Sequence, residues 1–250
     1  MKLKDKIAII TGGASGIGKA AALLFAKEGA KVVIAGIDEK KGKAAAEEII
    51  SNGSDSIFVK CDVSSSKDVK NMVDKAIKSF GTIDILFNNA GIYEDRPVHE
   101  LPEELWDKTI DTNLKGVFLC SKYAIPIMMR NKKGTIINNS SALGIVAEPE
   151  SPAYCSSKAA VIHLTKVMAL AYARDNIRVN CICPGPIDTP MFRKSFKSPK
   201  DSENYIKNHT ITGRIGKPEE VAKVVLFLAS DDASLITGSA YSVDGGEAIA

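Results

Sequence analysis

Short apolar runs of strand length alternate along the chain with longer segments whose apolar residues recur every three to four positions. The short runs predict strands buried on both faces, and the longer segments predict helices. Their regular alternation predicts one doubly wound α/β domain, in which helices cover both faces of a seven-stranded parallel sheet. The predicted strands are residues 7–10, 32–35, 56–60, 83–87, 135–138, 178–182 and 240–243. The predicted helices are residues 16–27, 40–51, 67–80, 103–130, 153–174 and 219–230.

Residues 190–212 lack either pattern and are rich in Lys and Ser. Such a segment is typical of disordered surface. After the sixth strand of this fold it would equally suit a mobile loop that covers a substrate site.

The composition is that of a single soluble globular domain, with 250 residues, 45% hydrophobic and 25% charged. This length accommodates a sizeable core in one domain, residues 1–250. The net charge is only +3, and lysines alternate with acidic residues, so no basic stripe indicates nucleic-acid binding. No apolar run is long enough for a signal-peptide core or a membrane span, and we expect no membrane partner.

The five cysteines and three histidines show no spacing typical of a metal site, so no metal is expected. Cys181 and Cys183 alternate along a predicted strand and are interpreted as small core residues. Reduced thiols are the simplest account of these cysteines, which predicts a cytoplasmic protein.

A glycine-rich loop, Thr11-Gly12-Gly13-Ala14-Ser15-Gly16-Ile17-Gly18, follows the first predicted strand and opens the first predicted helix. Glycine permits a tight turn and a close approach of the backbone to a pyrophosphate, whose charge the helix N-terminus attracts. The glycine spacing differs from the commoner Gly-x-Gly-x-x-Gly of dinucleotide-binding proteins. A plain turn is the alternative, but the strand–loop–helix context favours nucleotide binding.

Two further predicted strands end in residues suited to a ligand crevice. Asp62 follows the third strand, where its carboxylate would reach an adenine ring, although an exposed turn aspartate is the alternative. Asn88-Asn89-Ala90-Gly91 follows the fourth strand, at the carboxyl edge of the sheet where ligands bind in such folds. A simple turn is again the alternative.

Tyr154 and Lys158 stand four residues apart in a predicted helix, so their side chains share one face. A tyrosine with a pKa of about 10 is a poor base at neutral pH, but a neighbouring ammonium favours the phenolate and lowers that pKa. Ser141 follows a predicted strand, and its hydroxyl is placed to hydrogen-bond a substrate oxygen facing Tyr154. The pattern predicts acid/base chemistry, although Tyr-x-x-x-Lys also arises by chance in lysine-rich chains.

Together these motifs resemble the short-chain dehydrogenase/reductase family, in its common single-domain branch of about this length. The resemblance covers nearly the whole chain, from the glycine loop to Val243-Asp244-Gly245-Gly246. The other matching positions are Asn88-Asn89-Ala90-Gly91, Asn113, Ser141, Tyr154, Lys158, Pro184-Gly185, Thr189 and Arg214-Ile215-Gly216-Lys217-Pro218. The resemblance implies a Rossmann fold and an NAD(P)-dependent oxidoreductase that interconverts a secondary alcohol and a ketone.

The resemblance also implies a role for each matching residue. Tyr154 is the acid/base, and Lys158 lowers its pKa and hydrogen-bonds the nicotinamide ribose. Ser141, rather than its neighbour Ser140, polarises the substrate carbonyl, and Asn113 holds a water that links Lys158 to solvent. The Pro184–Thr189 turn holds the nicotinamide carboxamide. The expected cofactor-binding residues are Gly12, Ser15, Gly16, Ile17, Gly18, Ile37, Asp38, Asp62, Val63, Asn89, Ala90, Gly91, Tyr154, Lys158, Pro184, Gly185, Ile187 and Thr189.

The chain departs from the family pattern at the end of the second predicted strand. NAD-specific members carry Asp at the place of Gly36, and NADP-preferring members carry a basic residue at the place of Ile37 or Ser15. This chain has neither device. Because Asp38 and Glu39 would repel a 2′-phosphate more closely than Lys40 and Lys41 attract it, NAD is expected to be favoured, with NADP not excluded.

Two rival functions remain open at this stage. A dinucleotide-sensing or scaffold protein would keep the fold without turnover, but pure binding would not need Tyr154 beside Lys158. Nucleotide-sugar epimerisation would require a separate C-terminal substrate region, and the chain stops soon after the seventh predicted strand.

The substrate itself is not identified by the sequence, beyond a small alcohol or ketone. The expected pocket walls are Tyr93, Glu94, Leu143, Glu148, Glu150, Pro186, Met191 and Phe192. Glu148 and Glu150 are interpreted as solvated loop residues, with binding of polyol hydroxyls as the alternative.

The predicted helix 153–174 is apolar around much of its circumference and therefore needs partners on more than one side. Family members pair this helix and the last strand across two-fold axes, so the resemblance implies a homotetramer.

Overall fold

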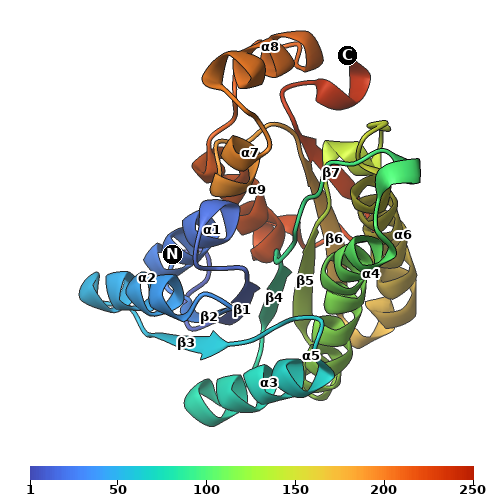
Figure 1. The fold of residues 1–250 in the computed structure, drawn as a ribbon. Coiled ribbons are helices and arrows are strands. Elements are labelled where there is room, and N and C mark those ends of the chain that lie inside the picture. Colours follow the sequence, from blue (N-terminus) through green and yellow to red (C-terminus); the bar gives the residue numbers. More distant parts are fainter.

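Seven parallel strands form the central sheet of the computed structural model, which describes residues 1–250 (Figure 1). Their spatial order is β3-β2-β1-β4-β5-β6-β7, which confirms the predicted doubly wound fold. The order reverses between β1 and β4, and ligands of such sheets bind at the carboxyl ends of the strands beside that point. The strands are β1 (Ile7–Thr11), β2 (Lys31–Gly36), β3 (Ser56–Lys60), β4 (Ile85–Asn88), β5 (Gly134–Asn139), β6 (Ile177–Pro184) and β7 (Ala240–Val243).

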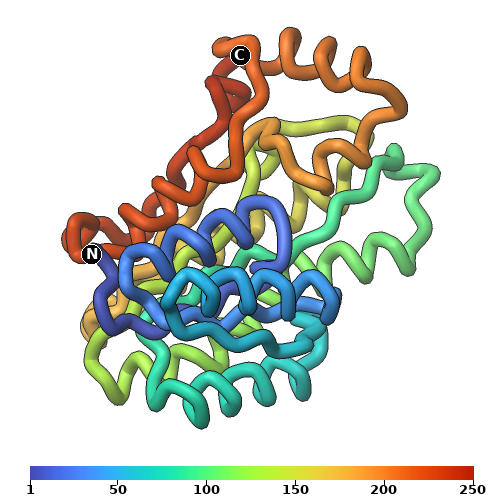
Figure 2. The backbone as a smooth tube through the Cα atoms, turned by 90° about the vertical axis from the view of Figure 1, so that its left-hand side faces the viewer, coloured from blue at the N-terminus to red at the C-terminus, as the bar shows by residue number.

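Helices cover both faces of the sheet, and each face has its own core (Figures 1 and 2). One layer holds α1 (Gly16–Lys27), α2 (Glu39–Ser51) and α9 (Pro218–Ala229). The other holds α3 (Ser66–Phe80), α5 (Gly116–Asn131) and α6 (Pro152–Tyr172), with α4 (Glu103–Ile110) packed against α6.

The central strands are buried on both sides, which explains their continuous apolar sequence. Every residue of β1 is buried, and its side chains alternate between the two layers. Ile10 packs into the cluster with α1 and α9, whereas Ile9 packs into the cluster with α3 and α5. Full burial of such a side chain stabilises the fold by about 1.5–3 kcal/mol.

The predicted helix 103–130 is interrupted. α4 ends at Ile110, a π-helical turn spans Asp111–Lys115, and α5 follows from Gly116. The prediction of one regular helix was therefore wrong in its middle, where the wider turn places Asn113 beside Gly91. Single π-helical turns inside helices often mark functional positions.

The predicted irregular segment 190–212 contains two helices, α7 (Pro190–Lys194) and α8 (Pro199–His209), so its description as a loop was wrong. Each helix begins with the same local signal. Thr189 and Ser198 cap the two N-termini through their side chains, and a proline follows each cap at the first helical position. The predicted mobility of the segment remains a prediction.

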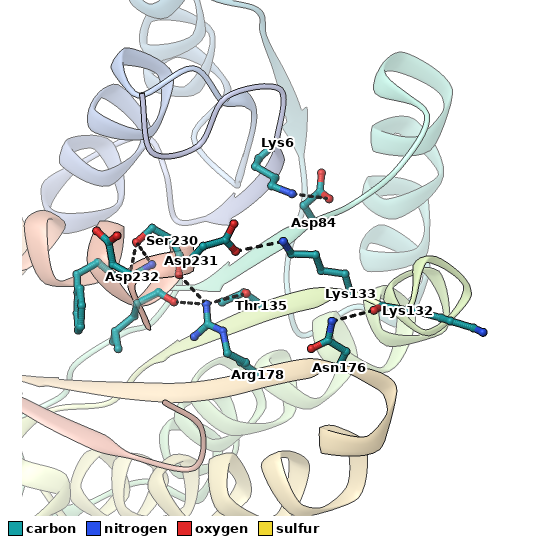
Figure 3. Close-up of polar contacts among 12 residues, drawn as sticks. Lys6, Asp84, Lys132, Lys133, Thr135, Asn176, Arg178, Ser230, Asp231 and Asp232 are labelled. Carbon is teal, nitrogen blue, oxygen red and sulfur yellow. Dashed lines mark hydrogen bonds and ion pairs between the residues drawn. The ribbon is translucent and has the colours of Figure 1, made fainter. Parts of the chain in front are cut away.

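A half-buried arginine ties the amino ends of the strands to the end of α9 (Figure 3). Arg178 on β6 donates to the Thr135 hydroxyl at 3.1 Å and to the carbonyls of Leu228 at 2.8 Å and Ser230 at 3.1 Å. Burial lowers the pKa of this guanidinium, but its ordinary value is so high that it stays charged. The cation thus satisfies carbonyls at a helix C-terminus, where the helix dipole favours positive charge.

None of the helices combines the length and the apolar sequence that crossing a membrane requires.

Candidate active site

A cavity of about 420 Å³ opens at the carboxyl ends of the strands, beside the point where the strand order reverses. Its walls join the predicted catalytic residues to parts of the predicted cofactor site. The predicted residues that line it are Ile17, Asn89, Gly91, Ser141, Tyr154, Lys158, Pro184, Gly185, Ile187 and Thr189. The fold therefore brings together motifs that lie as far apart in the chain as Ile17 and Thr189.

Ser141 is held at the end of β5, where the chain enters the short helical turn Ala142–Gly144. Its hydroxyl accepts a hydrogen bond from the Leu143 amide at 3.1 Å and lies 3.4 Å from the Pro184 carbonyl, to which it donates. It also lies close enough to the Tyr154 hydroxyl to lower the pKa of the tyrosine. Ser140 points elsewhere, donating to the Lys158 carbonyl at 2.7 Å. Ser141, and not Ser140, is thus aimed at the tyrosine.

Tyr154 lies in the first turn of α6, and its ring meets Tyr93 edge to face with 5.0 Å between the ring centres. Burial raises the pKa of Tyr154 to about 12, in spite of the opposing effect of Ser141. In the protein alone, loss of hydration therefore outweighs the effect of Ser141, and a lowering of the pKa by Lys158 stays a prediction. A phenol of this kind remains protonated at neutral pH and is suited to donating its proton.

Lys158 lies one turn further along α6, with its Nζ 5.4 Å from the centre of the Tyr154 ring. The ammonium donates to the Asn139 carbonyl at 2.8 Å, and the residue is only 4% exposed. Burial lowers the pKa of Lys158 to about 8. The same helical face thus carries an acid that resists ionisation and a cation whose charge is lost just above neutral pH.

The side chain of Asn113 is fully engaged in holding neighbouring segments together. Its amide oxygen accepts from the Ile92 amide at 2.8 Å, and its amide nitrogen donates to the Ile92 carbonyl at 2.9 Å. The same nitrogen lies 3.2 Å from the Ser157 hydroxyl, to which it also donates. These bonds fix the π-helical turn beside Gly91 and α6. A water relay through Asn113 would therefore have to use its backbone carbonyl rather than its side chain.

The glycine loop forms a tight cradle before α1. Gly12 and Gly16 have positive φ angles of 64° and 52°, which favour glycine. A Cβ on Gly18 would overlap the Gly12 carbonyl, so the helix can approach the strand only with glycine there. The Ser15 hydroxyl at the N-cap of α1 makes no capping hydrogen bond, and no acidic residue lies in the first turn. An open, positively polarised helix end of this shape fits a pyrophosphate.

Asn89 and Thr11 brace this loop against the end of β4. The Asn89 amide nitrogen donates to the carbonyls of Thr11 at 3.0 Å and Gly12 at 3.3 Å. The Thr11 hydroxyl accepts from the backbone amides of Asn89 at 3.0 Å and Ala90 at 3.1 Å. Asn89 and Ala90 therefore shape the cofactor site by holding two loops in register.

At the expected adenosine end, Asp38 caps α2 and accepts from the Lys41 amide at 3.0 Å, with the Lys41 ammonium 3.1 Å away. These contacts lower the pKa of Asp38, so its carboxylate is ionised at neutral pH. Ile37 is 72% exposed, and nothing lies within 4 Å of a Cβ added to Gly36. Gly36 stands where NAD-specific relatives carry an aspartate. The nearby Asp38 carboxylate is already paired with Lys41.

Asp62 and Val63, which follow β3, are the other residues expected to bind the adenosine part of the cofactor. The exposed Asp62 carboxylate accepts from the Ser64 amide at 2.9 Å and the Ser64 hydroxyl at 2.7 Å through the same oxygen. Its second oxygen makes no hydrogen bond to the protein and is free to bind a ligand. Val63 is buried against Gly116, whose lack of a side chain permits the contact.

The turn after β6 reaches back over the glycine loop. Ile187 is buried and pairs with Gly216, and Thr189 caps α7 by accepting from the Phe192 amide at 3.2 Å. A Cβ on Gly16 would lie 3.1 Å from the Thr189 methyl group, so the two loops nearly touch. Pro184, Gly185, Ile187 and Thr189 line the same cavity as Lys158 and would hold a nicotinamide ring there. The residues present fit a nicotinamide dinucleotide.

The structure places most of the expected substrate walls in the cavity. Glu94 does not line it, whereas its neighbour Asp95 does, so the prediction was wrong by one position. Glu150 is exposed at the rim, as expected for a solvated residue, but Glu148 is half-buried and belongs to the wall. The confirmed wall residues are Tyr93, Leu143, Glu148, Glu150, Pro186, Met191 and Phe192.

Several lining residues were not expected from the sequence: Asp95, Asn139, Ser195, Phe196, Tyr205, His209 and Glu247. Tyr205 and His209 stand four apart on α8, and recognition of the Ser198-Pro199 helix start would have placed them on one face. Glu247 lies beyond β7 in a segment without any motif, so no local signal could have found it.

Comparison with known proteins gives a consistent result. The family model described as enoyl-(acyl carrier protein) reductase matches residues 12–247. An oxidoreductase of Bacillus subtilis, YxbG, is 45% identical over 251 residues, covering 98% of this chain and 92% of the relative. The 3-oxoacyl-[acyl-carrier-protein] reductase FabG of Thermotoga maritima is 42% identical over 247 residues, covering 98% and 99%. The crystal structure of a short-chain type dehydrogenase/reductase from Mycobacterium marinum superposes with a TM-score of 0.95 at 36% identity, covering 100% of this chain and 98% of that one.

Proposed function

The chain belongs to the short-chain dehydrogenase/reductase family of NAD(P)-dependent oxidoreductases, and on that premise we propose that it interconverts a secondary alcohol and a ketone. One observation carries the proposal. Ser141 and Tyr154 line the same cavity, with Ser141 close enough to lower the pKa of Tyr154 and with the buried ammonium of Lys158 beside the tyrosine ring. A binding or scaffold protein has no need for a buried acid and cation in this arrangement.

In the reducing direction the ketone oxygen accepts hydrogen bonds from Ser141 and Tyr154. Tyr154 then gives its proton to that oxygen, and Ser141 stabilises the charge that develops there. The Lys158 ammonium stabilises the phenolate left on Tyr154. When bound, the nicotinamide cofactor supplies the hydride to the carbonyl carbon, or accepts it in the reverse direction.

Other groups of the site orient the cofactor and reprotonate Tyr154. We assign the Lys158 ammonium a second role as a donor to the nicotinamide ribose, because it faces the gap between Gly91 and the turn after β6. Reprotonation of Tyr154 would pass through Lys158 to a water held by the Asn113 carbonyl. The name of the FabG relative, a 3-oxoacyl reductase, supports a ketone as substrate.

We propose NAD as the favoured cofactor. Two nearby lysines are already engaged with acids, since Lys41 pairs with Asp38 at 3.1 Å and Lys43 pairs with Glu39 at 2.7 Å, whereas Lys40 forms no ion pair. A 2′-phosphate would compete with those carboxylates for the same cations. All five cysteines are free thiols, which supports the proposal of a reducing, cytoplasmic environment.

The test is a panel of ketones and secondary alcohols, assayed with both cofactors by absorbance at the reduced-nicotinamide band. The proposal expects turnover of at least one ketone and of the corresponding alcohol. Cofactor binding without turnover across a broad panel would instead support a dinucleotide sensor.

A further inference from the structure

Glu247 places a carboxylate inside the cavity from a segment that follows the last strand. Its residue is only 8% exposed, and the turn that carries it packs against the turn after Ser141. One carboxylate oxygen, Oε1, accepts from the Tyr205 hydroxyl at 2.9 Å. The other oxygen, Oε2, makes no hydrogen bond to the protein, and Glu247 forms no ion pair with lysine or arginine. Because Glu247 lines the cavity, its free oxygen is available to accept a hydrogen bond from a ligand or from water.

The electrostatic surroundings of Glu247 are acidic. Asp95, Glu148 and Glu150 also line the cavity, and none of them takes part in an ion pair within 4 Å. The only basic lining residues are Lys158, which is bonded to the Asn139 carbonyl, and His209, whose ring stacks on Tyr205. The cavity thus contains four carboxylates and one lysine, and that lysine is already bonded to the Asn139 carbonyl. An anion would be bound unfavourably there.

Aromatic rings form the wall next to Glu247. Phe196 lies between Phe192 and Tyr205, with ring centres 4.9 and 5.4 Å away, and His209 stacks on Tyr205 at 4.1 Å. Such a wall covers the apolar body of a compact substrate, and its ring faces attract a cation. Together the wall and the carboxylate present an apolar surface that ends in an acceptor.

We propose that Glu247 determines substrate specificity, by accepting a hydrogen bond from a donor group on a compact ketone, most strongly from an ammonium and next from a hydroxyl. The inference rests on the proposed function and narrows its substrate class. The carbonyl end lies between Ser141 and Tyr154, and the donor end reaches the free oxygen of Glu247. Substrates with a carboxylate or phosphate at that end are rejected.

The test compares cyclohexanones that differ only in the substituent at position 4: ammonium, hydroxyl, methyl or carboxylate. The expected order of kcat/KM is ammonium, hydroxyl, methyl, carboxylate, with the ammonium compound favoured over the methyl compound by about tenfold or more. Glu247→Gln is expected to lower that ratio by about tenfold while improving the carboxylate compound, since the amide carries no charge. Tyr205→Phe keeps the carboxylate and is expected to keep the ammonium preference.

Glu203→Gln is the matched control, because Glu203 is exposed on α8 and does not line the cavity. It should leave the ratio unchanged. Reduction of the methyl compound with no preference for ammonium in the wild-type protein would overturn the inference and leave the proposed function standing. An unchanged ratio in a folded Glu247→Gln protein would overturn it as well. Failure to reduce any ketone with either cofactor would instead remove the proposed function on which it rests.

Discussion

The Lys158 ammonium lies 5.4 Å from the centre of the Tyr154 ring, and burial moves the pKa values of the two side chains in opposite directions. The tyrosine rises to a pKa of about 12 and the lysine falls to a pKa of about 8. Each shift favours the uncharged form, as expected for groups removed from water. Between these two pKa values the tyrosine is protonated and the lysine is largely uncharged.

This relationship predicts the pH dependence of ketone reduction. Below a pH of about 8 the lysine is charged and the tyrosine holds its proton, so kcat/KM should be flat through neutral pH. As the pH rises through about 8, Lys158 loses the charge that stabilises the phenolate, and the rate should fall. The pH profile of kcat/KM for one accepted ketone measures this, with circular dichroism over the same pH range as the control for folding. A rate that stays constant well above pH 8 would contradict the role of the lysine charge.

Removal of the Tyr154 hydroxyl should stop proton transfer without disturbing the pocket. We expect Tyr154→Phe to lower kcat by roughly 10² or more and to leave the dissociation constant of the cofactor nearly unchanged. Tyr172→Phe, on the same helix but packed in the core, should retain activity. Steady-state kinetics with an accepted ketone and fluorescence titration of the cofactor check both effects. Wild-type turnover by the Tyr154 variant would refute the assignment.

Cofactor preference should respond to a carboxylate at the end of β2. Because open space surrounds the Cβ position of Gly36, Gly36→Asp should be accommodated and should bond the ribose hydroxyls while repelling a 2′-phosphate. We expect NAD to be preferred by the wild-type protein and the preference to rise by about tenfold in the variant. Ser51→Asp adds the same charge at the far end of α2 and should change nothing. The measurement is kcat/KM for both cofactors with one ketone, and a clear wild-type advantage for NADP would contradict the prediction.

Arg178 should contribute measurably to stability. Arg178→Met removes the donors to Thr135, Leu228 and Ser230, and only the Ser230 carbonyl keeps another donor, the Ala233 amide. We expect the free energy of unfolding to fall by about 2–3 kcal/mol, and Tm by about 5–10 °C. Arg174→Met, at an exposed position just before β6, is the control and should stay close to the wild-type Tm. Thermal unfolding followed by circular dichroism would show an unchanged Tm if the arginine were dispensable.

The exposed apolar side chains of α5 and α6 support the prediction of a homotetramer. Leu170 is 85% exposed and Val167 and Phe118 are each 49% exposed, which is unfavourable unless another copy covers them. Leu170→Asp should shift the protein towards smaller assemblies in sedimentation velocity. Ile50→Asp, an exposed position on α2, should not. A wild-type protein that sediments as a monomer at micromolar concentration would rule out the tetramer.

The sequence by itself determined the alternating elements and the motifs at their ends. Strand and helix periods, the positive-φ glycines before α1 and the one-turn spacing of Tyr154 and Lys158 are local properties, so they could be predicted without the fold. The helices α7 and α8 were equally local, since their capping residues precede proline in the chain, and they were missed only because the polar composition resembles a loop.

Tertiary structure decided the properties that depend on distant neighbours. The pKa of Tyr154 rises because segments from several parts of the chain exclude water from it, which the adjacent lysine could not reveal. The side-chain amide of Asn113 hydrogen-bonds Ile92 and Ser157, and the π-helical turn that permits these bonds has no sequence signature. Glu247 enters the cavity only because β7 returns the chain to the carboxyl edge of the sheet. Burial and long-range contact are properties of the folded chain, because each depends on which remote segments surround a residue.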